Sequence, residues 1–471
     1  MSKFKLTTAY IDYYNRRNEA HYIQTKKDNN SRYKFLSSNE ILKLEYKKYI
    51  SDIKRTLNKY PNCKIDELQK LRQNLSNIDA QLLQQYSINE LYNDNVLNAT
   101  KCVVNSIFYT NNDKDDLTYN FLIKKYIHDL TKIGEKSAIG FAFNADFKDV
   151  SHMFIIKTIQ DVNFDDDLLH ELMVGLYGTN RLRQAIPNFA YIYGGFKCSP
   201  PILGENNQVT DWCKQPKGVF GMNNENMVNY ILYENVNPSI SIKDFTQTCS
   251  VDEFLNIFLQ ILYALDYAHK TIDFTHYDLH SGNILLRIPN PNEPDKLYQI
   301  LYKTENGWEY ITTKYIPTFI DYGMSHCKNE SLKKYENIDN LGVFKFLDLS
   351  INPDRSWIMY DVYKFLVAVY IDAFNNNNKP VIDTIKYIYK FFNYEDDFYK
   401  LIREQLGLYH SIPYTEDTYN LFTIDKLIKH IKIKYNCDFI SKNRNSEQLL
   451  KCEDLCIKKE DLYNIIIQNQ E

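Results

Sequence analysis

The sequence predicts an α+β protein with two unequal lobes, a small lobe rich in strands and a larger helical lobe. Short apolar runs typical of strands concentrate between residues 120 and 236, with one helical pattern among them. Beyond residue 236, most of the chain has the periodicity of helices. Strands followed by helices are typical of α+β packing. We therefore expect a helical extension over 1–119, a strand-rich lobe over 120–236 and a helical lobe over 237–471.

The composition is that of a globular protein with a sizeable core. The 471 residues are 44% hydrophobic and 25% charged, which is ordinary for such proteins. The formal net charge of -4 argues against a broad nucleic-acid-binding surface. The N-terminus has no apolar stretch of the signal-peptide kind, and no run approaches the roughly 20 apolar residues of a membrane span. We expect a soluble cytoplasmic protein that binds neither nucleic acid nor membranes, and the oligomeric state is left open.

The nine cysteines predict reduced thiols. Their number is odd and no CxxC pair occurs, and the nearest pair, Cys452 and Cys456, has no matching histidines. Such usage favours a cytosol-like compartment over a disulfide framework or a zinc site.

The N-terminal extension predicts a helical hairpin. Apolar residues recur at steps of three or four over 42–57 and again over 68–82, with Pro61 and Asn62 between the two patterns. This periodicity is typical of amphipathic helices, and a Pro-Asn pair favours a break between them. We interpret the apolar stripes as core packing rather than as a partner surface.

Three patterns define the strand-rich lobe. "SHMFIIKTIQ" (151–160) is a short apolar run with a single lysine, Lys157, and it predicts a strand. "FDDDLLHELMVGLYGTNRLRQAI" (164–186) predicts a helix, whose acidic first turn suits the positive end of the helix dipole. "NYILYENV" (229–236) predicts a second strand.

The helical lobe opens with a long helix and closes with several more. Ser250 and Glu253 have the spacing of a capping box, directly ahead of an apolar stripe. "SWIMYDVYKFLVAVYIDAF" (356–374) predicts a strongly apolar helix that "NNNNKP" ends. We expect the remainder of the chain to be helical.

Strands interrupt the helical lobe between its first two long helices. "NILLRI" (283–288) and "TFIDYGMS" (318–325) predict strands, the second ending in a turn. Between them, 297–315 predicts a β-hairpin insertion with its turn at 305–307, where the sequence is Glu-Asn-Gly.

A polar loop separates the long helix from the next strand. "HYDLHSGNILL" (276–286) brings together four polar side chains, those of His276, Asp278, His280 and Asn283. Such groups are poor material for a core, but they suit a site that holds a metal-bound phosphate beside a hydroxyl. A second carboxylate motif, "IDYG" (320–323), ends the next predicted strand.

The pattern H-x-D-L-x-x-x-N, followed by a strand and then by I-D-x-G, resembles the catalytic core of the protein-kinase-like superfamily. Within it, "HYDLHSGNILL" with "IDYG" resembles the serine/threonine protein kinases of large cytoplasmic (giant) DNA viruses, roughly over residues 125–410. The resemblance implies a two-lobed protein-kinase-like fold. It also implies ATP-dependent transfer of the γ-phosphate to Ser/Thr hydroxyls of a protein substrate, with Mg²⁺ or Mn²⁺, in the host cytoplasm or the virion.

The resemblance assigns catalytic and metal-binding roles. Asp278 would orient the substrate hydroxyl or accept its proton. His280 lies where serine/threonine kinases carry a lysine that faces the transferred phosphate, and a protonated imidazole could replace that lysine. Asn283 and Asp321 would supply oxygen ligands to the metal ion, with Asp321 as the principal charged ligand. Phosphoryl transfer depends on such positioning and electrostatics.

The resemblance also implies a nucleotide site in the strand-rich lobe. Lys157 would hold the α- and β-phosphates. Glu171 would be the carboxylate partner that a buried ammonium needs. Backbone groups of Glu234 and Val236 would meet the adenine edge, with Tyr233 at the back of the site.

The phosphate-covering loop matches least well. "KIGEKSAIGFAF" (132–143) places Gly134, Ser137 and Gly140 where backbone amides could cradle phosphate. The middle glycine of G-x-G-x-x-G is absent, and an ordinary tight hairpin also explains the stretch.

Structural interpretations stay open for the other residues. Asp278 and Asn283 could be turn residues at a helix-to-strand corner, and Asp321 could belong to a plain turn. Lys157 could point to water from an edge strand. Asp361 matches the family's buried helix aspartate, which hydrogen-bonds the catalytic-loop backbone, or it could cap its own helix.

The sequence also departs from the family pattern. Tyr277 stands where regulated kinases carry an arginine that pairs with a phosphorylated activation loop, so we expect no such switch. "D-L-H-x-G-N" also resembles small-molecule kinases of the same fold, the aminoglycoside and choline-type phosphotransferases. A catalytically inactive scaffold (a pseudokinase) is a third hypothesis, against which the retained Lys157, Asp278, Asn283 and Asp321 count.

Overall fold

The computed structural model describes a part of the chain in detail. The described residues are 43–49, 51–52, 55, 97, 100–101, 104, 124, 127–134, 140–147, 150–159, 165–204, 209–213, 227–304, 307–329, 340–341, 356–392, 422–450 and 455. Ser137 and the second predicted N-terminal helix, 68–82, lie outside this part.

The chain divides into two compact units, each built from separate stretches. The helical unit comprises Met1–Glu45, Ser241–Asn283 and Met324–Cys437, and the strand unit comprises Tyr46–Ile240, Ile284–Gly323 and Asp438–Glu471. The described chain is therefore a mixed α/β protein. The hairpin at 297–315 belongs to the strand unit.

A five-stranded antiparallel sheet dominates the strand unit. Its order is β1-β2-β3-β7-β4, and its strands are β1 (Ile127–Ile133), β2 (Phe141–Phe147), β3 (Val150–Thr158), β7 (Val228–Glu234) and β4 (Ile192–Cys198). The strands predicted at 151–160 and 229–236 are confirmed. Lys157 on β3 pairs with Ala142 on one side and Ile231 on the other, so the edge-strand interpretation of Lys157 is wrong.

The sheet buries a ladder of aromatic and aliphatic side chains. Burial alternates along β2, whereas every residue of the inner strand β7 is buried. Phe154 contacts Phe147 and Tyr193 edge to face, with ring centroids 5.5 and 5.2 Å apart. Aromatic and β-branched residues fit such a pleated, buried surface, and burial of one such side chain contributes roughly 1.5–3 kcal/mol.

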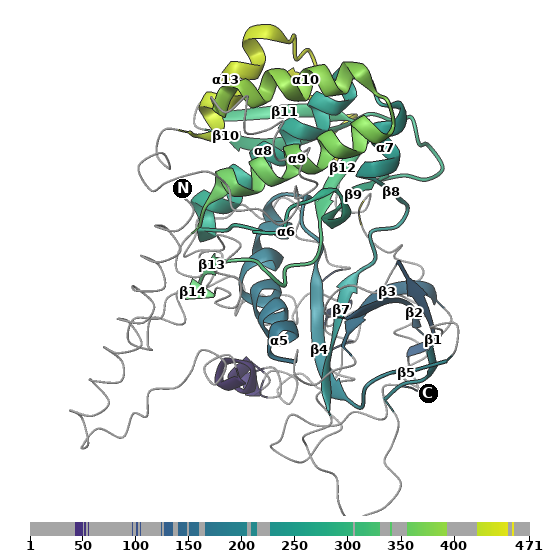
Figure 1. Cartoon of the computed structure of the whole chain (residues 1–471). Helices are drawn as coiled ribbons and strands as arrows, with labels where there is room; N and C mark the ends of the chain where they lie inside the picture. Colours follow the sequence, from purple (N-terminus) through teal and green to yellow (C-terminus); the bar gives the residue numbers. More distant parts are fainter. Residues whose placement is uncertain are drawn as a thin grey trace, which may run out of the picture. The chain divides into compact units, whose positions relative to one another are not determined.

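The helix predicted at 164–186 forms with a local irregularity. It consists of α5 (Asp165–Val174), a π-helical turn (Gly175–Thr179) and α6 (Asn180–Ala185), and α5 lies beside β4 (Figure 1). A Cβ atom at Gly175 would lie 2.1 Å from Ile192 Cδ1. Asn180 bonds both the backbone N–H and the carbonyl of Ile192, each at 2.8 Å. Close packing on β4 therefore accompanies the irregular turn.

Smaller sheets complete the strand unit. They contain β5 (Ile202–Leu203), β6 (Val209–Asp211), β8 (Ser239–Ser241), β9 (Ile284–Arg287), β10 (Tyr298–Thr304), β11 (Gly307–Thr313), β12 (Ile316–Phe319) and β15 (Ile440–Ser441). The hairpin is confirmed, because β10 and β11 pair in register from Tyr298 with Thr313 to Thr304 with Gly307. The predicted strand at 318–325 ends earlier, at Phe319.

The prediction that the chain is helical to its end is wrong for residues 436–450, which contain no helix. Ile440 and Ser441 pair with Ile311 and Tyr310 of β11, and the side chain of Gln299 accepts a hydrogen bond from Asn445 N at 2.6 Å. These contacts attach the stretch to the hairpin of β10 and β11. A two-residue strand is too short to show a periodic pattern in the sequence.

Helices α8, α9 and α10 pack side by side in the helical unit (Figure 1). Its elements are α7 (Ile242–Thr248), α8 (Val251–Ile272), α9 (Ile358–Asn375), α10 (Lys379–Tyr389), α13 (Ile424–Lys434), the 3₁₀ turns Ser281–Asn283 and Lys390–Phe392, and the paired strands β13 (Cys327–Lys328) and β14 (Asn340–Leu341). Among the helices described, none combines the length and apolarity needed to cross a membrane.

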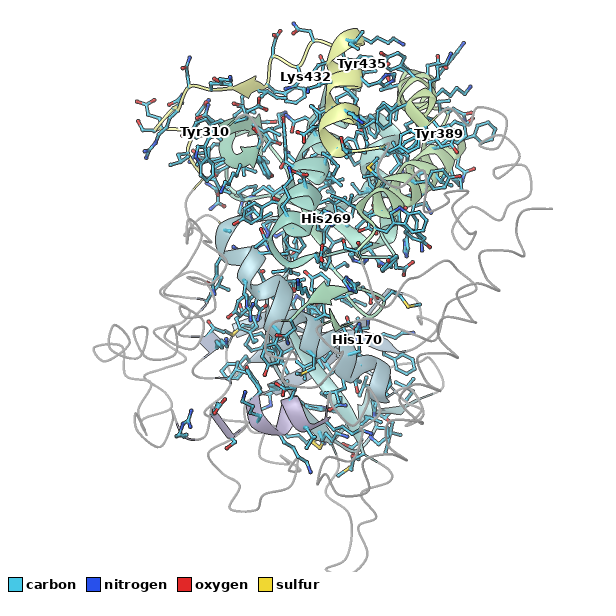
Figure 2. All side chains as sticks on the ribbon, turned by 90° about the vertical axis from the view of Figure 1, so that its left-hand side faces the viewer. His170, His269, Tyr310, Tyr389, Lys432 and Tyr435 are labelled. Atoms are coloured by element: carbon cyan, nitrogen blue, oxygen red, sulfur yellow. A yellow bond between two sulfur atoms is a disulfide. The ribbon has the colours of Figure 1, made fainter. Side chains whose placement is uncertain are left out.

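Capping residues set the helix boundaries of this unit. The predicted capping box is confirmed, because Ser250 and Glu253 bond reciprocally at the start of α8. The apolar helix ends at Asn375 as predicted, and Asn378 then caps α10. Figure 2 shows Tyr389 on α10 and Lys432 and Tyr435 around the end of α13.

The described part of the N-terminal extension supports core packing. Residues 43–49 are helical, and the buried Tyr46 donates a hydrogen bond to the carbonyl of Gly195 on β4 at 2.9 Å. The ring of Tyr49 meets that of Tyr177 edge to face.

The expectation of reduced cysteines is wrong for one pair. Cys198, at the end of β4, and Cys213, just after β6, form a disulfide with their Cα atoms 5.0 Å apart. Cys249, Cys327 and Cys437 are not in disulfides. The pairing follows from strand placement, which cysteine spacing does not reveal.

A buried ionic cluster joins α6, β7 and β9. The Glu234 carboxylate accepts bonds from Arg183 at 3.3 and 3.4 Å and from Tyr191 N at 3.0 Å, and it pairs with Arg287 at 2.8 Å. Burial alone would raise the pKa of Glu234, but the charges of Arg183 and Arg287 lower it to about 2. The carboxylate is therefore ionised at neutral pH.

Replacement of Glu234 by glutamine should destabilise the protein, because two buried guanidinium groups lose their counter-charge. We expect a loss of about 3–5 kcal/mol in the free energy of unfolding, measured by urea denaturation at pH 7. The difference should shrink as the pH falls from the ordinary glutamate pKa towards 2, since the wild-type carboxylate then becomes protonated. Glu293→Gln, at an exposed position, is the matched control. Equal midpoints for both variants would contradict the cluster's importance.

Candidate functional site

Three charged residues predicted from the sequence meet in the strand unit. The Lys157 ammonium on β3 lies 2.8 Å from Glu171 Oε2 on α5 and 2.7 Å from Asp321 Oδ1 after β12. The side chain of Glu171 is 2% exposed, that of Lys157 13% and that of Asp321 37%. The structure thus gives Lys157 the carboxylate partner that its burial requires, and a second carboxylate that reaches solvent.

Electrostatics keep this lysine charged. Burial would lower the pKa of Lys157, but the neighbouring charges of Asp321 and Glu171 raise it above its ordinary value. For Glu171, burial and the Asp321 charge raise the pKa, while Lys157 opposes them. Two carboxylates share one cation, so a further positive charge at Asp321 would be stabilised there.

Two tyrosines adjoin the group. The Tyr233 hydroxyl donates a short hydrogen bond to Glu171 Oε1. The Tyr322 hydroxyl donates to the carbonyls of Ala190 and Phe319 at 3.0 and 2.9 Å, and the two tyrosine rings are 6.3 Å apart. These bonds fix the position of Tyr322, which directly follows Asp321.

Asp321 forms a turn and an ion pair at once. Its backbone has φ = 64°, an unusual conformation for a residue with a side chain, and its carboxylate accepts a 3.4 Å hydrogen bond from Gly323 N. The turn interpretation is correct for the backbone, but it omits the bond to Lys157. Holding a non-glycine residue in this region costs about 1–3 kcal/mol and is frequent at functional sites.

The polar loop 276–283 is bound to α9 within the helical unit. The Asp361 carboxylate, fully buried, accepts hydrogen bonds from His276 N at 2.6 Å and from Tyr277 N at 2.8 Å. Asp361 is the fourth residue of α9, and the position before the helix belongs to Trp357, whose side chain makes no cap bond. The helix-cap interpretation of Asp361 is therefore wrong, and its bonds to the loop backbone agree with the resemblance.

The loop side chains surround Asp278. Lys364 Nζ lies 2.5 Å from Asp278 Oδ1, Asn283 Nδ2 donates to Oδ2 at 3.3 Å and to the Asp278 carbonyl at 2.9 Å, and His280 Nε2 lies 3.7 Å from Oδ2. The structure thus brings Asp278, His280 and Asn283 together. The turn interpretation of Asp278 and Asn283 is supported by the bond between them, but it does not account for Lys364.

Sequence reasoning missed Lys364. Only three residues of α9 are charged, Asp361, Lys364 and Asp372. Spacings of three and eight residues place all three on one helical face. Asp372 accepts a hydrogen bond from Ser281 of the loop, and burial raises its pKa. The signal was available: a lysine in so apolar a helix needs a partner.

The hairpin β1–β2 contains the glycines of the predicted phosphate loop. Gly134 has φ = 67°, and a Cβ atom at Gly140 would lie 2.3 Å from the carbonyl oxygen of Thr158 on β3. Both positions therefore favour glycine for backbone reasons. The hairpin interpretation accounts for the described residues, and Ser137 lies outside them.

Hydrogen bonds and ion pairs hold Glu234, in the stretch predicted to contact adenine. Glu234 N donates to the carbonyl of Tyr191 at 2.8 Å, and the Glu234 side chain belongs to the ionic cluster. Val236 is buried. The adenine hypothesis can therefore use the Glu234 carbonyl and the Val236 backbone, but not the Glu234 amide.

Each of the two predicted metal ligands offers an oxygen atom within its own unit. In the strand unit Asp321 offers a carboxylate, and in the helical unit Asn283 uses its amide nitrogen towards Asp278, which leaves its amide oxygen unused by that bond. Mg²⁺ prefers such oxygens and takes few of its ligands from protein. Across the described residues, no group of three or more His, Cys, Asp or Glu side chains could hold a metal alone.

Comparisons with known proteins point to viral relatives. The chain is 29% identical over 243 residues to "Probable kinase 098L" of Invertebrate iridescent virus 3, covering 51% of this chain and 38% of the relative. It is 25% identical over 178 residues to "Uncharacterized protein 035R" of the same virus, covering 37% of this chain and 16% of that protein. It is 27% identical over 173 residues to "Uncharacterized protein 179R" of Invertebrate iridescent virus 6, covering 36% and 13%. No family model matches the chain.

These matches support a relationship to a viral kinase-like protein. The chain spans less than two fifths of the length of each of these relatives.

Asp361 should make stability depend on pH. Burial, partly offset by the two backbone hydrogen bonds, raises its pKa from 3.8 to about 7. The folded state therefore holds this proton where the unfolded state has lost it, and wild-type stability should fall as the pH rises from 4 to 7. Urea denaturation of wild type and Asp361→Asn across this range should show a flatter profile for the variant. Parallel profiles would contradict the assignment.

Proposed function

We propose that the protein is an ATP-dependent protein kinase that phosphorylates Ser/Thr hydroxyls of protein substrates. The observation that carries the proposal is the contact of Lys157, Glu171 and Asp321, which come from three separate segments of the strand unit. The relative named as a probable kinase supports phosphotransfer independently. The fold proposed with it is the two-lobed kinase fold, with an N-lobe over 120–236, a C-lobe over 237–471 and an extension over 1–119.

The strand unit would bind ATP. Lys157, held by Glu171, would contact the α- and β-phosphates, and the hairpin with Gly134, Ser137 and Gly140 would cover them. The Glu234 carbonyl and the Val236 backbone would meet adenine. Asp321 and Asn283 would hold Mg²⁺ or Mn²⁺, which neutralises phosphate charge when bound.

The loop would act on the acceptor. Asp278 orients the substrate hydroxyl and takes its proton as the hydroxyl oxygen bonds to the γ-phosphorus. The bond between that phosphorus and the bridging β-phosphate oxygen breaks, and ADP leaves. By resemblance, His280 would face the transferred group.

A viral kinase of this kind would act in the host cytoplasm or the virion. The relatives from iridescent viruses support a viral protein. The small-molecule phosphotransferase remains the second candidate, because His280 within "DLHSGN" (278–283) is the residue that departs from the protein-kinase pattern.

Phosphotransfer should require both carboxylates. Pure protein with labelled ATP, Mg²⁺ or Mn²⁺ and a generic protein substrate should transfer label. Asp278→Asn or Asp321→Asn should lower the rate at least about 100-fold, because the first removes the proposed general base and the second removes the charged metal ligand. Asp295→Asn, at an exposed position, should match wild type. Equal transfer by all variants, or none by wild type, would end the proposal. ATP consumption only with small alcohols would favour the second candidate.

Nucleotide binding should depend on Lys157 and on metal. Lys157→Met should weaken ATP binding at least about tenfold in calorimetry, because an ion pair with phosphate is lost, while Lys303→Met on β10 should bind as wild type does. Chelation by EDTA should weaken ATP binding to wild type but change little in Asp321→Asn. An unchanged affinity in Lys157→Met would remove this lysine from the nucleotide site.

A further inference from the structure

The residue two positions after Asp278 does not by itself identify which positively charged side chain faces the reacting groups. His280 occupies that position, and its Nδ1 accepts a hydrogen bond from Gly282 N at 3.0 Å. The other ring nitrogen, Nε2, faces Asp278 Oδ2 at 3.7 Å. An imidazole, unlike a lysine ammonium, is not a permanent charge at neutral pH.

A permanent charge reaches Asp278 from α9. Lys364 Nζ lies 2.5 Å from Asp278 Oδ1 and 3.3 Å from the carbonyl oxygen of Tyr277. Its side chain is 8% exposed. A buried ammonium is costly unless it is paired and hydrogen-bonded, and here both partners belong to the same loop. The loop therefore supplies both of these partners of the Lys364 ammonium.

Lys364 comes from the same helix that holds the loop backbone. Asp361, one helical turn earlier, binds the backbone N–H groups of His276 and Tyr277, so α9 holds the loop directly before Asp278. Lys364 occupies Oδ1 of Asp278 at close range. Oδ2 has longer contacts, 3.3 Å to Asn283 and 3.7 Å to His280, and it is the oxygen better placed to receive a proton from a hydroxyl.

We propose that Lys364 is the positioning residue of the phosphotransfer site: it orients Asp278 and supplies the positive charge that related kinases take from the lysine two residues after that aspartate. The inference rests on the proposed function. It moves to α9 the role that resemblance gives to His280. The acidic groups near Lys364 include Asp278 and Asp361, and those near His280 include Asp278 and Asp372.

The test compares Lys364 with His280 in the full chain. Lys364→Met should lower kcat at least about 100-fold with the KM for ATP changed less than about twofold, as for loss of a preorganised electrostatic contact. Lys364→Arg should recover part of the rate. His280→Gln should keep at least about a tenth of the wild-type kcat, because glutamine retains a hydrogen-bonding side chain and Lys364 retains the positive charge beside Asp278. Lys429→Met, at an exposed position on α13, is the matched control.

The most discriminating experiment moves the positive charge from position 364 to position 280. His280→Lys in the Lys364→Met background should raise kcat at least about tenfold over Lys364→Met alone, since a lysine returns two residues after Asp278. A merely structural Lys364 would not be rescued in this way.

The outcomes separate the inference from the proposed function. An inactive wild type ends the proposed function. An active wild type with undiminished kcat in Lys364→Met overturns the inference alone. A loss of kcat of about 100-fold or more in His280→Gln also overturns it. If thermal melting shows that Lys364→Met does not fold, His280→Gln and Lys364→Arg decide: the inference stands if both retain activity and is overturned if His280→Gln abolishes it.

Discussion

A buried ammonium group between two carboxylates organises the strand unit. Lys157 lies on the middle strand of the sheet with its side chain largely buried, and its charge is retained because Glu171 and Asp321 neutralise it. The requirement ties together a strand, a helix and the turn after β12. It also explains the neighbouring tyrosines, since Tyr233 bonds to Glu171 and Tyr322 anchors the turn that presents Asp321.

In the helical unit, one polar face of the apolar helix α9 pairs with the polar groups of the loop 276–283. Asp361 satisfies loop N–H groups, Lys364 balances Asp278, and Asp372 reaches Ser281. Three side chains on α9 thus determine the path and charge of an eight-residue loop. Because each is buried or half-buried, the loop and the helix depend on each other for satisfied polar groups.

Much of this could be predicted where a local rule applies. The strand carrying Lys157, the capping box at Ser250 and the hairpin of β10 and β11 follow from periodicity and turn chemistry, and a buried lysine calls for a partner such as Glu171. Tertiary placement decided the rest. The disulfide of Cys198 depends on two strands meeting, the π-helical turn on packing at Gly175, and the partner of Lys364 on the path of a loop 86 residues away.

The interleaved assembly of the two units has a practical meaning for dissecting the chain. Polypeptide crosses between them after Asn283 and after Gly323, so a fragment starting at Ser241 would carry Arg287 without the glutamate that neutralises it, and Tyr302 without the Asn188 side chain to which its hydroxyl donates. Neither half can be excised as one continuous piece with its interior intact. Co-expressed complementary fragments, rather than truncations, are the natural route to separating their contributions.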